Sequence, residues 1–225
     1  MGGFGSLTLG AAVAAETELE QVTVTANRLE EEIPQELAKY GTRVDVITAE
    51  QIKDGGFVDI AQALETLAPG VFIAPKNGPF DYVHASFQGS TTGDILWLVD
   101  GVRINNRLYN GTTPLDTLPA SMVERIEIIE GGQALFYGTS AVAGAINIVT
   151  KAFSETPDGA VTVAADTIHD RHFDGYARDT IGNNQFVVYG SADKSTGFQP
   201  FRDQDYQPST TDRRRDYEVL TVGVK

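Results

Sequence analysis

Hydrophobic residues along the chain follow two different patterns, and the change between them falls at about Lys151. From Gly41 to Lys151, short apolar runs alternate with stretches in which apolar residues recur every three or four positions. This mixture of strand and helix periods indicates an α+β domain. Beyond Lys151, apolar residues occupy every second position in several stretches, which is typical of β-strands with one apolar face. We therefore expect an α+β domain at residues 41–152, followed by antiparallel strands at residues 153–225.

Two short helices are predicted in the first region. One should begin at Thr48, because Thr48 and Gln51 have the spacing of a capping box, and it should end at Gly55-Gly56. The other should begin after Asp59, a residue type that caps helices, and Pro69-Gly70 should stop it. Its apolar stripe consists of Ile60, Ala63, Leu64 and Leu67. Shorter helical turns are expected at 119–122 and 133–137.

Short β-strands are expected around these helices. They are 44–47, 71–73, 83–87, 95–99, 102–104, 126–129 and 145–150. Asp100-Gly101 lies between two of them, and this dipeptide favours a tight hairpin because both central residues of such a turn adopt positive φ. The region is therefore predicted to form a small mixed sheet with short helices.

Four longer alternating strands are predicted after residue 152, at 160–167, 173–181, 185–193 and 216–225. Each is close to the ~9–11 residues that a tilted strand needs to cross a bilayer. Gly182 to Asn184 forms a short turn, whereas Lys194 to Arg215 forms a long polar connection. Short periplasmic turns and long extracellular loops are the rule in outer-membrane barrels. A soluble β-sandwich also contains strands of this kind, so the pattern alone leaves both alternatives open.

Composition narrows the function classes. The chain has 225 residues and a formal net charge of −14, which would repel a phosphate backbone, so we expect no nucleic-acid partner. It has no cysteine, which excludes thiolate metal sites and thiol catalysis. No apolar run reaches the ~18 residues of a spanning helix, so insertion into a membrane would require strands.

The first 40 residues lack the pattern of a folded domain. Phe4 to Ala15 is apolar and ends in small residues, so residues 1–15 are interpreted as a signal-peptide remnant. No Lys or Arg precedes this segment, and a disordered Gly/Ala tail is the alternative. Residues 16–40 are predicted to be a flexible arm with one β-prone run, Gln21 to Ala26, which is suited to adding itself to the sheet of another protein.

No arrangement of residues predicts catalysis, so we expect no enzyme activity, no cofactor and no metal site. The glycine-rich stretch 131–144 lacks both the order of a dinucleotide-binding motif and a Walker Lys. His169 and His172 are a weak metal signal, because two ligands on a flexible loop are insufficient. We expect these histidines in a solvated extracellular turn.

A series of motifs in a fixed order resembles the TonB-dependent outer-membrane receptors. The matching segments are Gln21-Val22-Thr23-Val24-Thr25-Ala26, 44–52, 59–71, 98–105, 123–128, 135–138 and 144–151. The first resembles a TonB box, and the others resemble successive parts of the plug domain. The chain departs from the family pattern twice, because Gln88 and Glu130 stand where plugs commonly carry arginine. Both changes remove a guanidinium able to bind barrel-wall carboxylates, so the plug–barrel charge pairing is expected to differ.

The resemblance implies an architecture and a set of partners. Residues 41–152 would form a plug, and residues 153–225 the first four strands of an incomplete transmembrane β-barrel, with further strands expected downstream because four strands cannot close. It implies uptake of a scarce nutrient, such as an iron–siderophore complex or cobalamin, across the outer membrane of a Gram-negative bacterium. The arm would lie in the periplasm and bind the C-terminal domain of TonB through Gln21 to Ala26, while the barrel would contact outer-membrane lipid.

Contacts with the small-molecule ligand are expected at loops on the outer face of the plug. The candidates are Tyr82, Arg103, Asn105, Arg107 and Tyr109, which suit a polar, anionic or aromatic molecule. The alternative is that these side chains only pack against the barrel wall. Other functions remain open: a freestanding plug-like periplasmic binding module, a non-functional fragment, or a hydrolase. The four amphipathic strands favour the receptor, and the lack of a convergent catalytic site disfavours the hydrolase.

Overall fold

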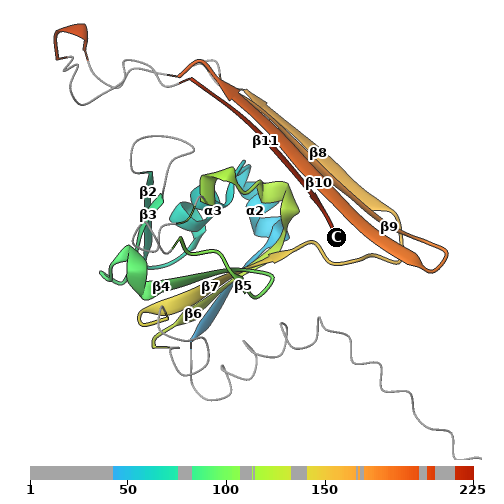
Figure 1. Cartoon of the computed structure of the whole chain (residues 1–225), viewed down its shortest axis with the longest axis horizontal. Coiled ribbons are helices and arrows are strands. Elements are labelled where there is room, and N and C mark those ends of the chain that lie inside the picture. Colours follow the sequence, from blue (N-terminus) through green and yellow to red (C-terminus); the bar gives the residue numbers. More distant parts are fainter. Residues whose placement is uncertain are drawn as a thin grey trace, which may run out of the picture.

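The computed structural model describes residues 43–75, 83–106, 113, 115–132, 141–165, 167, 170–197, 202–205 and 216–225. Figure 1 shows two parts: an α+β domain and four long strands that form a separate sheet beside it. This is the predicted fold class, a mixed sheet with short helices followed by antiparallel strands. The expected arm, the signal-peptide remnant and the helical turn at 133–137 lie outside the described residues.

The elements are short in the α+β domain and longer in the second part. In the α+β domain they are β1 (Val44–Thr48), α2 (Ala49–Gly55), α3 (Ile60–Leu67), β2 (Val71–Pro75), β3 (Val83–Phe87), η1 (Thr92–Asp94), β4 (Ile95–Val99), β5 (Val102–Arg103), η2 (Leu115–Thr117), η3 (Ala120–Met122), β6 (Val123–Glu130) and β7 (Gly144–Thr150). In the second part they are β8 (Asp158–Ala165), β9 (Arg171–Ile181), β10 (Asn184–Ser195), η4 (Asp203–Asp205) and β11 (Tyr217–Val224). The symbol η denotes a short 3₁₀ helix.

A five-stranded mixed sheet organises the α+β domain. Its order is β1-β6-β7-β4-β5, in which β4 runs parallel to β7 and the other neighbours are antiparallel. β7 is central and all its residues are buried, as expected for a strand that is covered on both faces. β2 and β3 pair with each other in a separate two-stranded sheet, a division that the hydrophobic pattern did not predict.

Both predicted helices form, and both have the predicted N-caps. The Gln51 amide donates a hydrogen bond to Thr48 Oγ1 at 3.3 Å, and the Thr48 amide donates one to the Gln51 side chain at 2.9 Å. α2 ends at Gly55, where Gly56 adopts φ +67°, a left-handed geometry that glycine tolerates at a helix end. The Gln62 amide donates to Asp59 at 2.8 Å and so begins α3. These local signals fix where the helices stand against the sheet.

The hairpin predicted at Asp100-Gly101 is also present. Asp100 adopts φ +46° and Gly101 φ +75°, so both central residues have the positive φ of a type I′ turn. β4 and β5 pair on either side of it. The Asp100 amide donates to the Ile148 carbonyl at 2.9 Å, which joins the turn to β7.

The main hydrophobic core lies between one face of the five-stranded sheet and a layer formed by α2, α3 and the β2–β3 pair (Figure 1). Its fully buried side chains include Trp97, Phe87, Ile60 and Leu64. Burying one large apolar side chain stabilises a fold by about 1.5–3 kcal/mol. Leu67, the last residue of the predicted stripe of α3, is partly buried against the same core. This packing holds the helices and the β2–β3 pair on the sheet.

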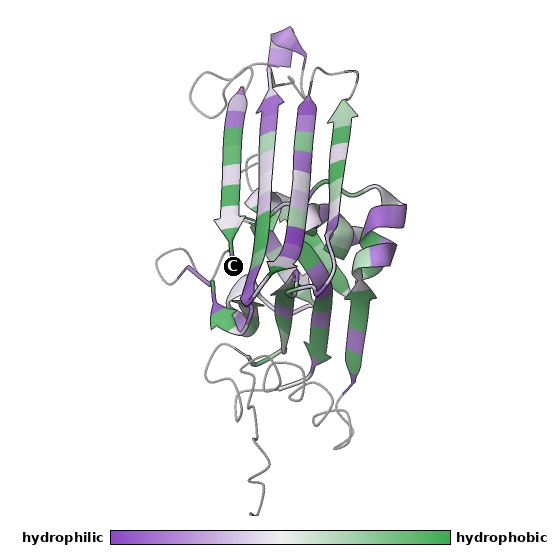
Figure 2. Ribbon diagram, turned by 90° about the vertical axis from the view of Figure 1, so that its right-hand side faces the viewer, coloured by the Kyte–Doolittle hydropathy of each residue, from purple (hydrophilic) through white to green (hydrophobic). Residues whose placement is uncertain are grey.

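The second part is one antiparallel sheet in the order β11-β10-β9-β8, called the long sheet below. Figure 2 shows hydrophobic and hydrophilic bands alternating along its strands. Its outward face carries large apolar side chains that are 40% to 76% exposed: Val161, Val163, Phe173, Ile181, Val188, Leu220, Val222 and Val224. Its inward face lies against the α+β domain, where Val187 on β10 is only 1% exposed. The two faces of the long sheet therefore meet different surroundings.

The long strands differ from the prediction mainly at their ends. β9 begins at Arg171 rather than at Phe173, and β10 continues to Ser195. Gly182 and Asn183 form the short turn between β9 and β10, as predicted. Among the helices that the structure describes, none is both long and apolar enough to cross a membrane.

Candidate functional site

The candidate site is the interface between the α+β domain and the inward face of the long sheet. The strand register aligns inward side chains in rows that run across neighbouring strands. The middle row consists of Thr162, Asp174, Ser191 and Thr221. The next inward row on one side contains His172 and Asp193. On the other side lies the row of Ala160, Tyr176, Tyr189 and Gly223, and beyond it the row that contains Asp158 and Arg178. The rows of His172, Asp174 and Arg178 position the hydrogen bonds that join β9 to the α+β domain and to neighbouring strands.

The middle row holds the segment of the α+β domain that contains η2 and η3. The Ser121 amide donates a hydrogen bond to Asp174 Oδ2 at 3.2 Å, and the Thr221 hydroxyl donates to the Thr117 carbonyl at 3.3 Å. Asp174 is 1% exposed. Because a buried carboxylate needs hydrogen-bond or charged partners, the contact with Ser121 fixes η3 against β9.

His172 lies in the row on one side, paired across the strands with Asp193 of β10. Its Nδ1 bonds to Asp193 Oδ1, and its Nε2 lies 3.6 Å from Asp174 Oδ2. The ring is buried, so the expected solvated turn is wrong for His172. The reason is that β9 begins before His172 and directs the imidazole toward the α+β domain. His169 lies outside the described residues.

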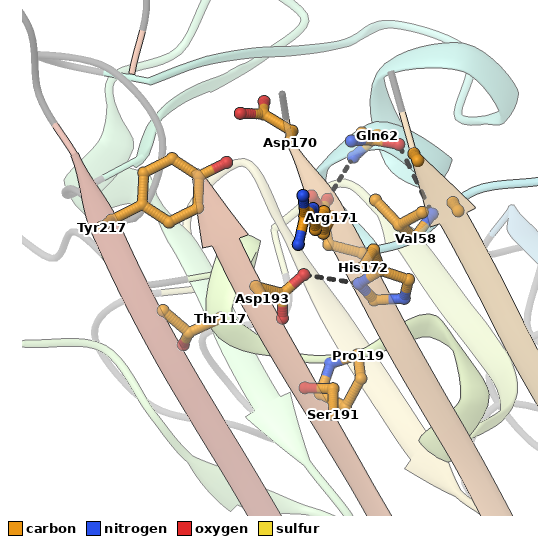
Figure 3. Close-up of a pocket in the computed structure, with 13 residues that line it drawn as sticks. Val58, Gln62, Thr117, Pro119, Asp170, Arg171, His172, Ser191, Asp193 and Tyr217 are labelled. Carbon is orange, nitrogen blue, oxygen red and sulfur yellow. Dashed lines mark hydrogen bonds and ion pairs between the residues drawn. The ribbon is translucent and has the colours of Figure 1, made fainter. Parts of the chain in front are cut away.

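A cavity of about 300 Å³ separates this part of the long sheet from the α+β domain. Figure 3 shows His172, Ser191 and Asp193 on the strands and Val58 and Gln62 on the opposite side. The cavity has polar partners on both sides, so water or another small polar molecule fits its chemistry. In the parts of the chain that the structure describes, no group of three or more His, Asp or Glu residues is placed to hold a metal ion.

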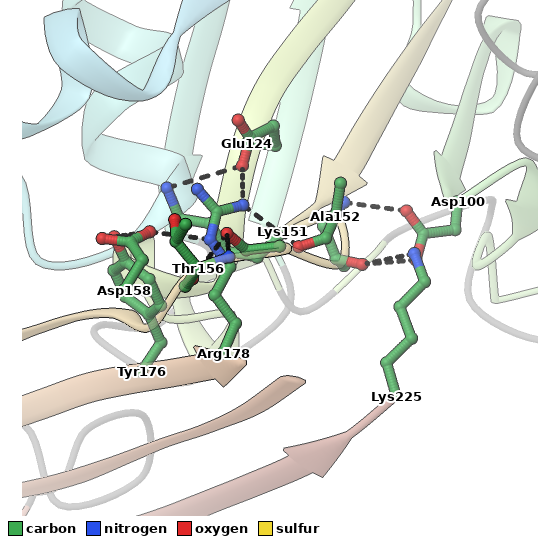
Figure 4. A network of polar contacts seen from close by, with 11 residues as sticks. Asp100, Glu124, Lys151, Ala152, Thr156, Asp158, Tyr176, Arg178 and Lys225 are labelled. Carbon is green, nitrogen blue, oxygen red and sulfur yellow. Dashed lines mark hydrogen bonds and ion pairs between the residues drawn. The ribbon is translucent and has the colours of Figure 1, made fainter. Parts of the chain in front are cut away.

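Arg178 on β9 lies two inward rows from Asp174, on the side away from His172, and connects several parts of the structure (Figure 4). Its guanidinium donates to Asp158 of β8 at 2.7 Å, to Glu124 of β6 at 3.0 Å and to the Ala152 carbonyl at 3.1 Å. Ala152 belongs to residues 151–157, called the connector below, which join β7 to β8. One side chain on β9 therefore binds the α+β domain, the connector and β8.

Lys151, the first residue of the connector, is enclosed by the same side chains. Its Nζ lies 3.8 Å from Glu124 Oε2 and 4.7 Å from the centre of the Tyr176 ring. Burial lowers the pKa of Lys151, an effect that Glu124 opposes and Arg178 reinforces. The ion pair and the ring face replace part of the water that an exposed ammonium would bind. Figure 4 shows Lys151 next to the guanidinium of Arg178.

Another contact joins the Asp100-Gly101 hairpin to the end of β11. Lys225 Nζ donates to Asp100 Oδ2 at 3.2 Å, and the Thr150 amide donates to Asp100 Oδ1 at 2.8 Å. Lys225 pairs through its backbone with Val187, and Val187 pairs with Arg178, so the two cations lie in one row of the long sheet. In this row the long sheet supplies both cations, and the α+β domain supplies the carboxylates of Glu124 and Asp100. Asp158 of β8 is a further carboxylate partner of Arg178 within the long sheet.

Gln88 and Glu130, the two residues that depart from the family pattern, contact each other. Gln88 Nε2 donates to Glu130 Oε2 at 3.0 Å. Arg43 Nη1 lies 3.4 Å from Glu130 Oε1. Glu130 is therefore paired with residues of the α+β domain itself, one just before β1 and one just after β3.

Two of the five predicted ligand residues are described. Arg103 lies in β5 and is exposed. Asn105 is buried, and its Oδ1 accepts from the Trp97 amide at 2.8 Å while its Nδ2 donates to the Ile95 carbonyl at 2.8 Å. These bonds continue the pairing of β4 past the end of β5, so Asn105 has a structural role. Whether either residue contacts a ligand stays a prediction.

The remaining predicted site residues fall on other parts of the chain. Tyr82, Arg107 and Tyr109 lie outside the described residues, and so does the TonB-box segment from Gln21 to Ala26. Their roles also stay predictions.

Sequence reasoning did not single out the residues that join the long sheet to the α+β domain. Asp174, Arg178 and Lys225 occupy inward positions of strands whose outward positions are apolar. The period of two was the available signal, because a charged residue on an inward face needs a partner inside. It did not identify the partners, since Arg178 and Glu124 lie 54 positions apart and Lys225 and Asp100 lie 125 apart.

Comparison with known proteins agrees with this arrangement. The family model of the TonB-dependent receptor plug domain matches residues 36–145. The solved structure of the ferric yersiniabactin uptake receptor FyuA from Yersinia pestis is similar with a TM-score of 0.62 and 19% identity, over 81% of this chain and 28% of that chain. The siderophore receptor PirA from Acinetobacter baumannii gives a TM-score of 0.59 and 25% identity, over 79% of this chain and 27% of that chain.

A third similar structure is a variant of the ferric enterobactin receptor PfeA from Pseudomonas aeruginosa in complex with enterobactin. It gives a TM-score of 0.55 and 25% identity, over 69% of this chain and 25% of that chain. This chain therefore spans about a quarter of the length of the receptors it matches. In such receptors the α+β domain is the plug and the long strands belong to the barrel. The family match identifies residues 36–145 as a TonB-dependent receptor plug domain, and the mixed sheet with the antiparallel strands after it has the fold of a plug followed by strands of the β-barrel.

Proposed function

We propose that this chain is the N-terminal portion of a receptor that imports an iron–siderophore complex through the outer membrane. The plug would occupy residues 41–152, and residues 153–225 would supply the first four barrel strands. The single observation that carries the proposal is a plug domain held by polar contacts on the inward face of strands whose outward face is apolar. Such a sheet suits lipid on one side and a plugged, polar lumen on the other.

The choice of ligand rests on the similar receptors. Their names refer to ferric yersiniabactin, enterobactin and siderophores. We therefore favour an iron–siderophore complex as the ligand over cobalamin, the other nutrient that the family resemblance implies. Arg103, Arg107, Tyr82 and Tyr109 would contribute cationic and aromatic contacts, which suit an anionic chelate with aromatic groups.

The energy for transport would arrive through the N-terminal arm. Gln21 to Ala26 would add a strand to the C-terminal domain of TonB, mainly through backbone hydrogen bonds. The arm leads into Arg43 and β1, and β1 is an edge strand that pairs only with β6 in the five-stranded sheet. A pull on the arm would thus act first on an edge strand, which has one neighbour in that sheet.

The test separates ligand binding from energised uptake. Val24→Pro removes one backbone donor from the middle of the proposed TonB box, whereas Glu18→Pro makes the same change in the arm outside it. In cells that produce the receptor from its own gene, we expect Val24→Pro to abolish uptake of radiolabelled ferric siderophore and to leave surface binding intact. Glu18→Pro should support uptake at the wild-type rate. Normal uptake by the Val24→Pro variant would overturn the role of this segment.

The ligand class is tested with the same cells. A panel of ferric catecholate siderophores, ferric yersiniabactin and cyanocobalamin should show saturable, TonB-dependent uptake of an iron chelate only. Uptake of cyanocobalamin alone would replace the proposed ligand, and uptake of none of these molecules would reject the receptor function in this form.

A further inference from the structure

The outward face of the long sheet, which Figure 2 views from the front, is hollowed near its centre. Gly175 of β9 lies directly opposite Gly190 of β10. The same row ends in Val161 of β8 and Val222 of β11. Two facing glycines therefore leave a gap between two valines.

The neighbouring rows extend this gap in both directions. Ala192 lies one outward position beyond Gly190 on β10, and Ala177 lies one outward position beyond Gly175 on β9, toward the opposite end of the sheet. The four small residues form the floor of a hollow of about 480 Å³, called the outward groove below. Its sides are formed by larger apolar residues: Val161, Phe173, Val188, Leu220 and Val222.

The small residues of the floor differ in what requires them. A Cβ at Gly175 would lie 2.8 Å from the Ala160 carbonyl oxygen, so close approach of β8 and β9 also requires glycine there. Ala192, in contrast, is exposed on the outward face. A larger side chain at position 192 would extend into the groove without entering the protein, which makes this position suitable for a test.

One end of the outward groove meets a charged row. Lys194 is the next outward residue after Ala192 on β10, and it pairs with Arg171 of β9 on one side and with Glu218 of β11 on the other. Lys194 Nζ lies 2.9 Å from Glu218 Oε2, and these two side chains are 64% and 72% exposed. Water weakens such an exposed pair, so the ammonium stays accessible to another anion. With two cations and one carboxylate, the row favours an anionic group.

Arg171 and Lys194 differ in their surroundings. Arg171 also borders the cavity on the inward face, next to His172 (Figure 3). Lys194 does not border that cavity. We therefore base the argument on Lys194.

The outward groove has the length of a lipid chain. From Lys194 to Val188, at the far end of the groove, the distance along β10 is about 20 Å at a rise of ~3.3 Å per residue. One leaflet of the hydrocarbon core is ~15 Å thick, and barrel strands cross it at a tilt of ~45°. An acyl chain that begins beside Lys194 therefore ends within the groove.

We propose that the outward groove binds one acyl chain of a phosphorylated glycolipid of the lipid A type, with a phosphate of its headgroup on Lys194. The phosphate would displace Glu218 from Lys194 and form a charge-assisted hydrogen bond with the ammonium. The inference rests on the proposed function, because it requires the long sheet to be barrel wall. Lys194 lies at the end of β10 that leads into the long connection, which is extracellular under the barrel rule, so the lipid belongs to the outer leaflet.

Binding is measured on the full-length receptor, produced from its own gene and purified in detergent. The probes are lipid A, its dephosphorylated form and phosphatidylglycerol. Native mass spectrometry counts the lipids retained, and thermal unfolding reports the stabilisation that binding confers. The wild type should retain lipid A several-fold more than either other lipid, and lipid A should raise its Tm. Equal retention of the three lipids would mean that lipid only coats the sheet, and would overturn the proposal.

Two substitutions separate the chain contact from the headgroup contact. Ala192→Leu fills the groove beside Gly190 and leaves the charge unchanged, so selective retention of lipid A should be lost. Lys194→Gln leaves the groove open and removes the cation, so lipid A should be retained no better than its dephosphorylated form. A wild-type preference for lipid A in either variant would contradict the proposed site.

Each substitution has a matched control. Val224→Phe adds bulk at an outward position that does not border the groove. Lys53→Gln removes an exposed lysine near the end of α2, in the α+β domain. Both controls should retain lipid A as the wild type does. All four variants should unfold at the wild-type temperature in the absence of lipid, which shows that a lost preference does not come from misfolding.

Failure of this inference can be told apart from failure of the proposed function. A receptor that imports ferric siderophore but shows no preference for lipid A overturns the lipid site and leaves the receptor function standing. A receptor that prefers lipid A but imports no iron chelate rejects the proposed function and leaves the lipid site standing.

Discussion

Gln88 and Glu130 lie 42 positions apart and are joined by a hydrogen bond of 3.0 Å. They are also the two positions at which this plug departs from the arginines that are common in the family. Because the two side chains satisfy each other, the departures form one coupled change rather than two independent ones. Glu130 would face an arginine at position 88 just as readily, but an arginine at position 130 would lie beside Arg43.

The coupling predicts opposite effects for two charge changes at this contact. Gln88→Arg should leave the free energy of unfolding within about 1 kcal/mol of wild type, because it replaces a hydrogen bond with an exposed ion pair. Glu130→Arg should destabilise the plug by about 1–2 kcal/mol, because it places a cation beside Arg43 and leaves Gln88 without its acceptor. Urea unfolding of the detergent-solubilised protein measures both values. Equal losses in the two variants would contradict the coupling.

Asp100 combines a turn conformation with a set of contacts, and two substitutions separate these roles. Asp100→Asn keeps a residue type that tolerates φ +46° and retains one acceptor oxygen, so a loss of about 1 kcal/mol is expected. Asp100→Ala removes the acceptors for Thr150 and Lys225 and strains the turn, so about 2–3 kcal/mol is expected. Thermal unfolding ranks the two variants. A smaller loss of stability in Asp100→Ala than in Asp100→Asn would contradict these roles of Asp100.

Asn105 is predicted to stabilise the plug, whereas Arg103 is predicted to contact the ligand. Asn105→Ala leaves the Trp97 amide and the Ile95 carbonyl without their buried partner, which should cost about 1–3 kcal/mol. Trp97 is the only tryptophan, so its fluorescence reports this loss directly. Arg103→Ala should change the free energy of unfolding by less than about 1 kcal/mol, because contacts of an exposed side chain contribute little, and it should weaken ligand binding in equilibrium titrations. A destabilised Arg103→Ala variant with normal binding would reverse the two assignments.

The contacts of Asp94 in the η1 turn predict that the stability of the fold depends on pH in the acidic range. The Thr91 hydroxyl and the Thr91 amide both donate to Asp94, and together they hold the pKa of that carboxyl below its ordinary value of 3.8. A carboxyl with a lowered pKa in the folded state stabilises the fold above its unfolded pKa, and this contribution is lost as pH falls through the folded value. Stability should thus decline as pH drops below 3.8, and Thr91→Ala should flatten the decline. Urea midpoints measured between pH 7 and pH 2 with identical slopes in both proteins would refute it.

Local signals in the sequence predicted the helices and the hairpin well. The capping box at Thr48 and Gln51, the cap at Asp59 and the Asp100-Gly101 turn each depend on residues within four positions of one another. Their geometry follows from steric and hydrogen-bonding preferences that do not require the rest of the fold.

The contacts between the plug and the long sheet could not be predicted from the sequence, because they join residues that are far apart in the chain. Arg178 meets Glu124, and Asp174 meets Ser121, only because the plug packs on the long sheet in one particular position. His172 is expected in a turn because the predicted strand starts at Phe173, and no short-range pattern reveals that β9 begins at Arg171. Alternation indicates which side chains point inward, but the contacts they make depend on tertiary packing.

The bond between Lys225 and Asp100 spans more of the chain than the other contacts between the plug and the long sheet described here. Bringing two such distant residues together costs loop-closure entropy, so the contact forms slowly. It cannot form until β11 has been synthesised and paired with β10. The hairpin of the plug therefore acquires this partner only after β11 has joined the long sheet. The plug and the long sheet therefore have to lie close together by the time β11 pairs with β10.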